Sequence, residues 1–280
     1  MIKTPLSTVI GGAFWTPGAT ILGSASKNLT QLIKSLFATG EQGFAYDPND
    51  PSTLYQDAAG TIPVTGAGQP VGLMKDKSGR NNHAFQVVSA SRPILQRNAT
   101  TGAYYLAFDG TDDFLQTNNI DFTATDKVSL FAGVRKLSNA ATSVIAEFSG
   151  NTALTTNSFY LVGLVSSALQ FNSRGSGISS IVNSPSFPAP SSVVISSVGD
   201  ISGDVSKIRA NGGSYAVNVG DQGTGNYGNY PLYMGRRGGT SLAFNGHIYG
   251  LIGVGTLISD NETTALEKFI AKNTGVTLSV

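Results

Sequence analysis

Few residues of this chain could carry acid–base chemistry. It has no cysteine and only two histidines, His83 and His247, which we interpret as structural. Retaining glycosidases need two carboxyl groups about 5–5.5 Å apart, and two residues of one strand share a face only at an even spacing. Glu147 has no acid two or four positions away, so we interpret it as a solvent-facing strand residue. The other glutamates are Glu41, Glu262 and Glu267. The sequence therefore predicts no catalytic residue and no enzyme.

Two clusters of oxygen-bearing side chains could bind a metal ion. They lie at residues 47–50 (DPND) and 109–113 (DGTDD). Neither has the glycine at position 6 and the glutamate at position 12 of a helix–loop–helix calcium site. Turns in which an aspartate side chain accepts backbone N–H groups explain both clusters. We predict no cofactor and no metal, and a surface calcium ion at residues 109–113 stays open.

Residues 223–228 match the glycine spacing of a dinucleotide-binding loop, which requires a helix to begin there. Pro231 and a strand-like segment follow instead, so we interpret the motif as a loop between strands. The same region holds the candidate ligand-binding residues, Tyr227, Tyr230, Arg236 and Arg237. Tyrosine rings and arginine donors suit sugar stacking and hydroxyl hydrogen bonds. The alternative is ordinary loop tyrosines beside a structural arginine pair.

Short segments in which apolar and polar residues alternate must position these residues. The segments are rich in β-branched and aromatic residues and are separated by Gly, Asn, Asp, Ser and Pro, which is typical of an all-β antiparallel sandwich or jelly roll. The expected strands are 104–108, 114–117, 128–134, 143–148, 158–165, 168–171, 178–182, 192–198, 206–210, 215–219, 232–235 and 247–254. Residues 43–98 are rich in turns, and a C-terminal helix should begin at the Ser259–Glu262 capping box and end at Gly275.

The N-terminal segment predicts an irregular arm over residues 1–23 and a short helix that Ser24 or Ser26 opens and Gly40 ends. The helix carries an apolar stripe: Leu29, Leu32, Ile33, Leu36 and Phe37. One interpretation is that the helix caps the main domain. The other, which we favour because Trp15 lies in the arm, makes residues 1–42 an attachment or oligomerisation segment and residues 43–280 one domain.

The charge content argues against several partners. Only 12% of the residues are charged and the net charge is +1, so nothing attracts nucleic acid or an anionic membrane. We find no apolar stretch of about 18 residues that would span a bilayer. The N-terminus lacks the continuous apolar segment of a signal peptide. The expectation is synthesis in a cytoplasm without membrane insertion.

Several motifs follow one another in a fixed order along the chain. They are residues 76–83 (DKSGRNNH), 105–114 (YLAFDGTDDF), 128–132 (VSLFA), 232–236 (LYMGR), 244–248 (FNGHI) and 257–262 (LISDNE). Together they resemble laminin-G-like, concanavalin A-like jelly-roll modules. That resemblance implies the fold and says little about function.

A more particular stretch, at residues 46–48, 55–57 and 72–74, resembles laminin-G-like domains of tailed-bacteriophage virion proteins. It implies a non-enzymatic fibre, tail or head-decoration protein in the virion. Its partners would be capsid or tail proteins and host surface glycans, and a homo-oligomer such as a trimer would suit it. The alternatives are a secreted carbohydrate-binding module and, third, a glycoside hydrolase.

Overall fold

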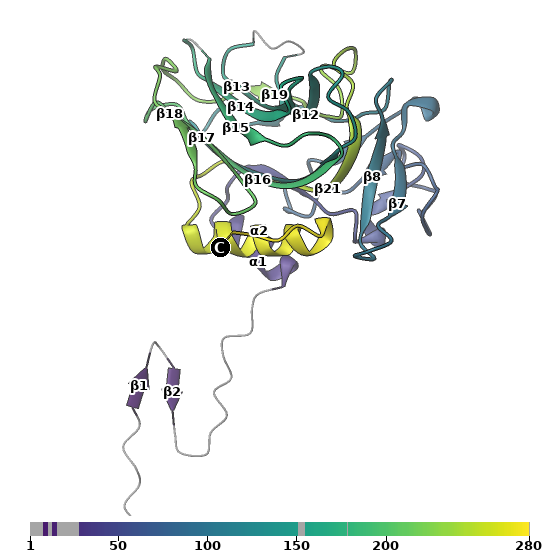
Figure 1. Ribbon diagram of the computed structural model, residues 1–280, viewed down its shortest axis with the longest axis horizontal. Helices are drawn as coiled ribbons and strands as arrows, with labels where there is room; N and C mark the ends of the chain where they lie inside the picture. The colour runs from purple at the N-terminus through teal and green to yellow at the C-terminus, as the bar shows by residue number, and fades with distance from the viewer. Residues whose placement is uncertain (1–7, 11–12, 16–27, 151–154, 178, 280) are drawn as a thin grey trace, which may run out of the picture.

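The computed structural model describes residues 8–10, 13–15, 28–150, 155–177 and 179–279. Two antiparallel sheets stack face to face as a sandwich (Figure 1). The eight-stranded sheet runs in the order β18 (Ala216–Asn218), β17 (Val205–Ala210), β16 (Ser191–Asp200), β11 (Lys127–Lys136), β21 (Asn245–Val254), β8 (Tyr104–Asp109) and β7 (Ile94–Arg97), with β3 (Gly43–Tyr46) paired to β21. All-β architecture is therefore confirmed.

The nine-stranded sheet faces it. Its order is β15 (Ser180–Ser186), β14 (Ala168–Arg174), β13 (Ser158–Gly163), β12 (Ser143–Phe148), β20 (Leu232–Met234), β9 (Leu115–Thr117), β6 (Ala84–Phe85), β5 (Leu73–Met74) and β4 (Leu54–Tyr55). Small pairs are β1 (Thr8–Ile10) with β2 (Ala13–Trp15), and β10 (Ile120–Asp121) with β19 (Asn229–Tyr230). Two 3₁₀ turns are η1 (Pro51–Thr53) and η2 (Ser89–Ser91).

The core lies between the sheets, because alternate residues of each strand point inward. Leu106 and Phe108 of β8 belong to the same buried cluster as Phe159 of the opposite sheet. At one end of the core, Phe148 stacks on Phe159 at 4.9 Å, and Phe122 meets Phe148 edge-on at 5.0 Å between ring centroids. Each such ring stabilises the fold by roughly 1.5–3 kcal/mol through burial.

Two helices cover the outer face of the eight-stranded sheet (Figure 1). Helix α2 (Asp260–Thr274) begins at the expected Ser259–Glu262 capping box and ends at Gly275, whose φ of 76° favours glycine. Helix α1 (Leu29–Leu36) begins later than expected. Asn28, not Ser24 or Ser26, caps it, since Asn28 and Gln31 exchange side-chain and backbone hydrogen bonds.

The apolar stripe of α1 is covered by other parts of the same chain. It packs with Leu266 and Ile270 of α2 and with Phe131 and Ile252 of the sheet. The stripe residues are Leu29, Leu32, Ile33, Leu36 and Phe37, all buried. The proposal that they form an attachment face is therefore wrong, and the helix caps the sandwich. The side chain of Trp15 lies outside the described residues.

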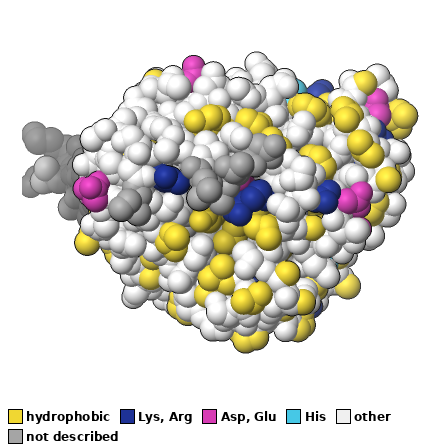
Figure 2. All heavy atoms as spheres, turned by 90° about the horizontal axis from the view of Figure 1, so that it is seen from above, with side chains coloured by type: hydrophobic (Ala, Val, Ile, Leu, Met, Phe, Trp, Pro, Cys, Tyr) yellow, Lys and Arg dark blue, Asp and Glu magenta, His cyan; other side chains and the backbone are white. Residues whose placement is uncertain are grey.

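The surface carries little charge. Lysine, arginine, aspartate and glutamate are scattered among polar and hydrophobic side chains on the face that Figure 2 shows. No helix of the described ranges is long and apolar enough to cross a membrane.

Candidate functional site

Tyr227 belongs to the core and cannot stack on a sugar. Its side chain is 1% exposed, its hydroxyl lies 2.6 Å from Ser173 Oγ, and its ring meets Phe159 edge-on at 5.4 Å. Burial raises the pKa of its hydroxyl well above the ordinary value. The expectation that Tyr227 binds a ligand is wrong, because the aromatic end of the core encloses it.

The other three candidates serve separate local contacts. Tyr230 is half-buried and its ring lies 5.6 Å from that of Phe148. Arg236 donates from Nη2 to the Thr240 carbonyl at 3.1 Å. Arg237 forms an ion pair with Glu147. These contacts agree better with ordinary loop tyrosines beside structural arginines than with a sugar-binding cluster.

Glu147 is buried, which corrects the expectation that it faces solvent. Its side chain has no exposed area. Oε2 accepts from Arg237 Nε at 2.7 Å and Oε1 from the Ser149 hydroxyl at 2.7 Å. The Arg237 guanidinium also lies 5.4 Å from the centroid of the Tyr160 ring. Both faces of β12 are covered, so this carboxylate serves an internal ion pair.

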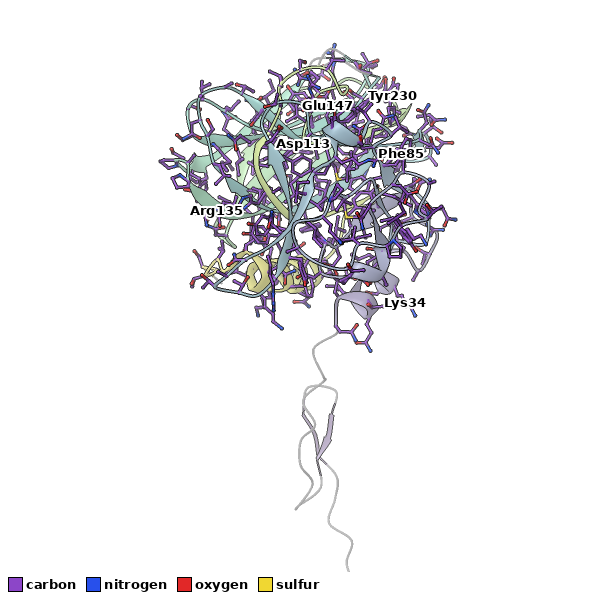
Figure 3. All side chains as sticks on the ribbon, turned by 90° about the vertical axis from the view of Figure 1, so that its right-hand side faces the viewer. Lys34, Phe85, Asp113, Arg135, Glu147 and Tyr230 are labelled. Carbon is purple, nitrogen blue, oxygen red and sulfur yellow. The ribbon has the colours of Figure 1, made fainter. Side chains whose placement is uncertain are left out.

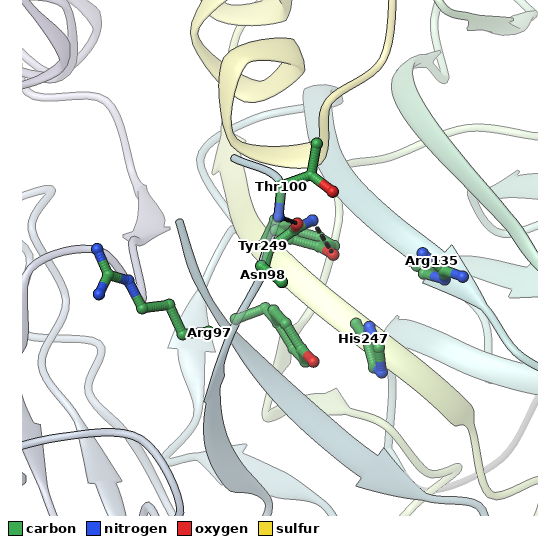
Figure 4. A pocket seen from close by; sticks show the side chains of 8 residues that line it. Arg97, Asn98, Thr100, Arg135, His247 and Tyr249 are labelled. Carbon is green, nitrogen blue, oxygen red and sulfur yellow. Dashed lines mark hydrogen bonds between the residues drawn. The ribbon is translucent and has the colours of Figure 1, made fainter. Parts of the chain in front are cut away.

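A pocket of about 290 Å³ lies on the outer face of the eight-stranded sheet (Figure 4). Its lining comes from β8, β11, β21, the last residue of β7 and the segment that follows it. Leu106 and Ile248 point into the core, so their strand neighbours Tyr105, His247 and Tyr249 point outward. The lining residues are Arg97, Asn98, Ala99, Thr100, Tyr105, Arg135, His247 and Tyr249.

Three rings form the aromatic part of this pocket. Tyr105 stacks on His247 with centroids 4.0 Å apart and planes at 19°. Tyr249 lies 5.0 Å from Tyr105 and 6.3 Å from His247. Asn98 Nδ2 donates to the Tyr249 hydroxyl at 3.1 Å, which leaves that hydroxyl proton for another acceptor.

The polar groups of the pocket are donors and a neutral imidazole. Burial, helped by the charge of Arg135, lowers the pKa of His247 to about 4. The buried Nδ1 of His247 and Nε of Arg135 have no hydrogen-bond partner among the described residues. The lining includes neither aspartate nor glutamate. The arrangement can stack a ring and donate hydrogen bonds, and it lacks the carboxyl pair of a glycosidase.

Sequence reasoning missed this site, although a signal existed. The signal is the even spacing of His247 and Tyr249, which puts both side chains on one face of β21. Tyr105 joins them only because β8 pairs with β21, and local sequence patterns do not reveal which strands are neighbours.

A second hollow holds two carboxylates, Glu41 and Asp121. Burial acts to raise the pKa of Glu41, but hydrogen bonds, chiefly from Thr39, outweigh it and hold that pKa below its ordinary value. Hydrogen bonds from Thr123 lower the pKa of Asp121. Both groups are therefore ionised near neutral pH, and neither is suited to act as the protonated acid of glycoside hydrolysis.

The acidic turn at residues 109–113 has the expected backbone geometry. Asp109 Oδ1 accepts from the Thr111 N–H at 2.7 Å, and Asn49 N–H donates to Asp47 in the other turn at 3.0 Å. Oxygens of Asp109, Asp112 and Asp113 lie within 4.8 Å of one another. Burial and the charge of Asp109 raise the pKa of Asp113 to about 7.

Comparisons with known proteins identify the class of fold. No family model matches the chain. No curated protein matches it in sequence. An arabinofuranosidase complexed with arabinofuranosyl-α-1,2-xylobiose aligns at 14% identity and a TM-score of 0.55, over 86% of this chain and 65% of that one. At this identity the likeness shows the β-sandwich fold alone.

Further solved structures share the sandwich. Botulinum neurotoxin type C, whose cell entry depends on interaction with two ganglioside molecules, aligns at 12% identity and a TM-score of 0.54, over 82% of this chain and 51% of that one. The binding domain of botulinum neurotoxin DC in complex with SialylT aligns at 13% identity and a TM-score of 0.51, over 80% of this chain and 52% of that one. The chain therefore spans about half the length of these toxin chains.

Proposed function

We propose that this protein is a non-enzymatic carbohydrate-binding β-sandwich whose ligand occupies the pocket of Tyr105, His247 and Arg135. The observation that carries the proposal is the Tyr105–His247 stack beside Arg135, whose side chain has no hydrogen-bond partner among the described residues. Aromatic faces pack against the C–H faces of sugars, while donors at the edge bind hydroxyl oxygens. The volume of about 290 Å³ lies at the small end of the range of small-molecule sites, which begins at about 300 Å³.

Several observations favour binding over cleavage. Glu147, the one glutamate on a strand of the sandwich, is neutralised by Arg237. The aromatic pocket has no carboxylate, and the two carboxylates of the second hollow both have lowered pKa values. The arabinofuranosidase complex holds a substituted xylobiose and the type C neurotoxin interacts with gangliosides, and both are of the chemical class proposed here.

An array of purified glycans tests this function. We expect retention of a subset of glycans by the wild-type protein and loss of retention by Tyr105→Ala. Tyr230→Ala is the matched control, because it removes another half-buried ring that does not line the pocket. Figure 3 shows that Arg135 of the pocket and Tyr230 lie at separate places on the molecule. A blank array, or equal loss with both folded variants, would contradict the proposal.

We also propose that the module is part of a bacteriophage virion, as a fibre, tail or head-decoration protein. The support is the resemblance of residues 46–48, 55–57 and 72–74 to laminin-G-like domains of tailed-bacteriophage virion proteins. Since the stripe of α1 is used internally, docking on other virion proteins falls to residues 1–27 in this proposal. Mass spectrometry of purified particles should find the full-length protein and lose it after deletion of residues 1–27. Its recovery from culture medium alone would favour a secreted module instead.

A further inference from the structure

Arg135 stands out among the arginines of the chain. Every other arginine whose hydrogen bonds the structure gives donates to a carbonyl or carboxylate: Arg80, Arg92, Arg97, Arg174, Arg209, Arg236 and Arg237. The side chain of Arg135 donates to none of the described residues, although it is partly buried in the wall of the pocket. Its Nε is fully enclosed, and a buried donor of a charged group is costly to leave without an acceptor.

The accessible part of Arg135 is the end that a ligand would meet. Only its Nε is both enclosed and unpartnered. The two terminal nitrogens also lack a partner among the described residues, and they are not enclosed, so they are open to solvent on the pocket side. Figure 4 shows Arg135 beside His247 at the edge of the aromatic group. The fork of a guanidinium matches the two oxygens of a carboxylate.

The rest of the pocket agrees in charge. No acidic side chain lines the pocket to compete for Arg135. The guanidinium of the other lining arginine, Arg97, donates to the Gly102 carbonyl and lies over the Tyr104 ring, away from Arg135 (Figure 4). His247 is neutral above about pH 4, so the positive charge beside the three rings at neutral pH comes from Arg135. The Tyr249 hydroxyl has a proton to donate once it has accepted from Asn98.

We propose that the ligand of this pocket is an acidic sugar, whose carboxylate pairs with Arg135 while its ring packs on Tyr105 and His247. This rests on the proposed carbohydrate-binding function and specifies its substrate class. A charge-assisted contact of this kind contributes about 10- to 100-fold in affinity. The guanidinium fork can also pair with two oxygens of a sulfate or phosphate group, so the test includes sulfated glycans without carboxylates.

The test uses the full chain on an array of uronic- and sialic-acid glycans, their carboxyl-reduced counterparts, and sulfated glycans without carboxylates. We expect reduction of the carboxyl group to weaken binding at least about tenfold. Arg135→Met should weaken binding of the acidic glycans by a larger factor than binding of the reduced ones. Arg135→Lys should give an intermediate loss. Lys34→Met is the control, since it removes the same charge from an exposed site on α1 (Figure 3).

The outcomes separate this inference from the function on which it rests. Equal binding of acidic and reduced glycans would overturn the inference and leave carbohydrate binding intact. A preference for sulfated over carboxylated glycans, or a uniform loss with Arg135→Met, would also overturn it. No binding to any glycan would overturn both.

Discussion

The ring of Tyr105 stacks on the imidazole of His247 with centroids 4.0 Å apart. The two residues come from adjacent strands, where His247 pairs with Ala107, so Tyr105 is its diagonal neighbour on the same outward face. Burial in this stack keeps the imidazole neutral at physiological pH. His247 therefore serves as a flat aromatic surface beside Arg135, and its charge state becomes a measurable property of the pocket.

His247 should make folding stability fall at acidic pH. Its folded-state pKa of about 4 lies below the ordinary 6.5, so the folded state favours the neutral form. The resulting stability is complete above pH 6.5 and is lost as the pH falls from 6.5 towards 4. We expect His247→Phe, which keeps an aromatic ring, to lose less melting temperature between pH 7 and pH 4 than the wild type. Equal losses would contradict this assignment.

Asp113 should make folding stability fall as the pH rises, the opposite of the effect of His247. Its pKa of about 7 in the folded state exceeds the ordinary 3.8, because burial and Asp109 disfavour its charge. Stability from this group is complete below pH 3.8 and is lost as the pH rises towards 7. Asp113→Asn should therefore raise the melting temperature relative to wild type more at pH 8 than at pH 4. Asp121→Asn is the control, since hydrogen bonds from Thr123 lower the pKa of Asp121 and the sign should reverse.

The Glu147–Arg237 pair should be sensitive to loss of one partner. Arg237→Met leaves a carboxylate with no exposed area and no cation. We expect a loss of about 3–5 kcal/mol in the free energy of unfolding, measured by urea denaturation. The double variant with Glu147→Gln should recover part of that loss, because the uncompensated charge is gone. A double variant less stable than Arg237→Met would show that the charge is not the cause.

Helix α1 should prove part of the folded unit. Deleting residues 1–27 removes no described contact of the sandwich and should leave the melting temperature unchanged. Deleting residues 1–42 exposes the apolar faces of α2 and the sheet, and Leu32→Ala alone should cost about 2–5 kcal/mol. Lys34→Ala, on the exposed side of the same helix, is the matched control. Equal melting temperatures for the two deletion variants would show that α1 does not stabilise the sandwich and belongs with the N-terminal arm.

Local signals explain which predictions succeeded. The Ser259–Glu262 capping box and the alternation of Leu106 with Tyr105 act within a few residues, so α2 and the strands could be predicted. The Asn28–Gln31 box has the same spacing, but nearby serines offered competing starts.

Non-local contacts explain the failures. Tyr227 and Glu147 are polar residues whose burial depends on partners far along the chain, Ser173 and Arg237. The pocket likewise needs the adjacency of β11, β21 and β8, which only the sheet order supplies. Alternation indicates which face of a strand a residue occupies, but it does not say which strand lies beside it.

Serines between the two sheets offer a last test of the interior. Ser206 has no exposed area, and its hydroxyl has no hydrogen-bond partner among the described residues. Ser173 is equally buried, but its hydroxyl lies 2.6 Å from that of Tyr227. Ser206→Ala removes an unpaired polar group, so we expect an unchanged or higher free energy of unfolding. Ser173→Ala strands the Tyr227 hydroxyl and should cost about 1–3 kcal/mol in urea denaturation. If Ser206→Ala were as costly as Ser173→Ala, an internal water must satisfy the Ser206 hydroxyl, and this end of the core would be hydrated rather than dry.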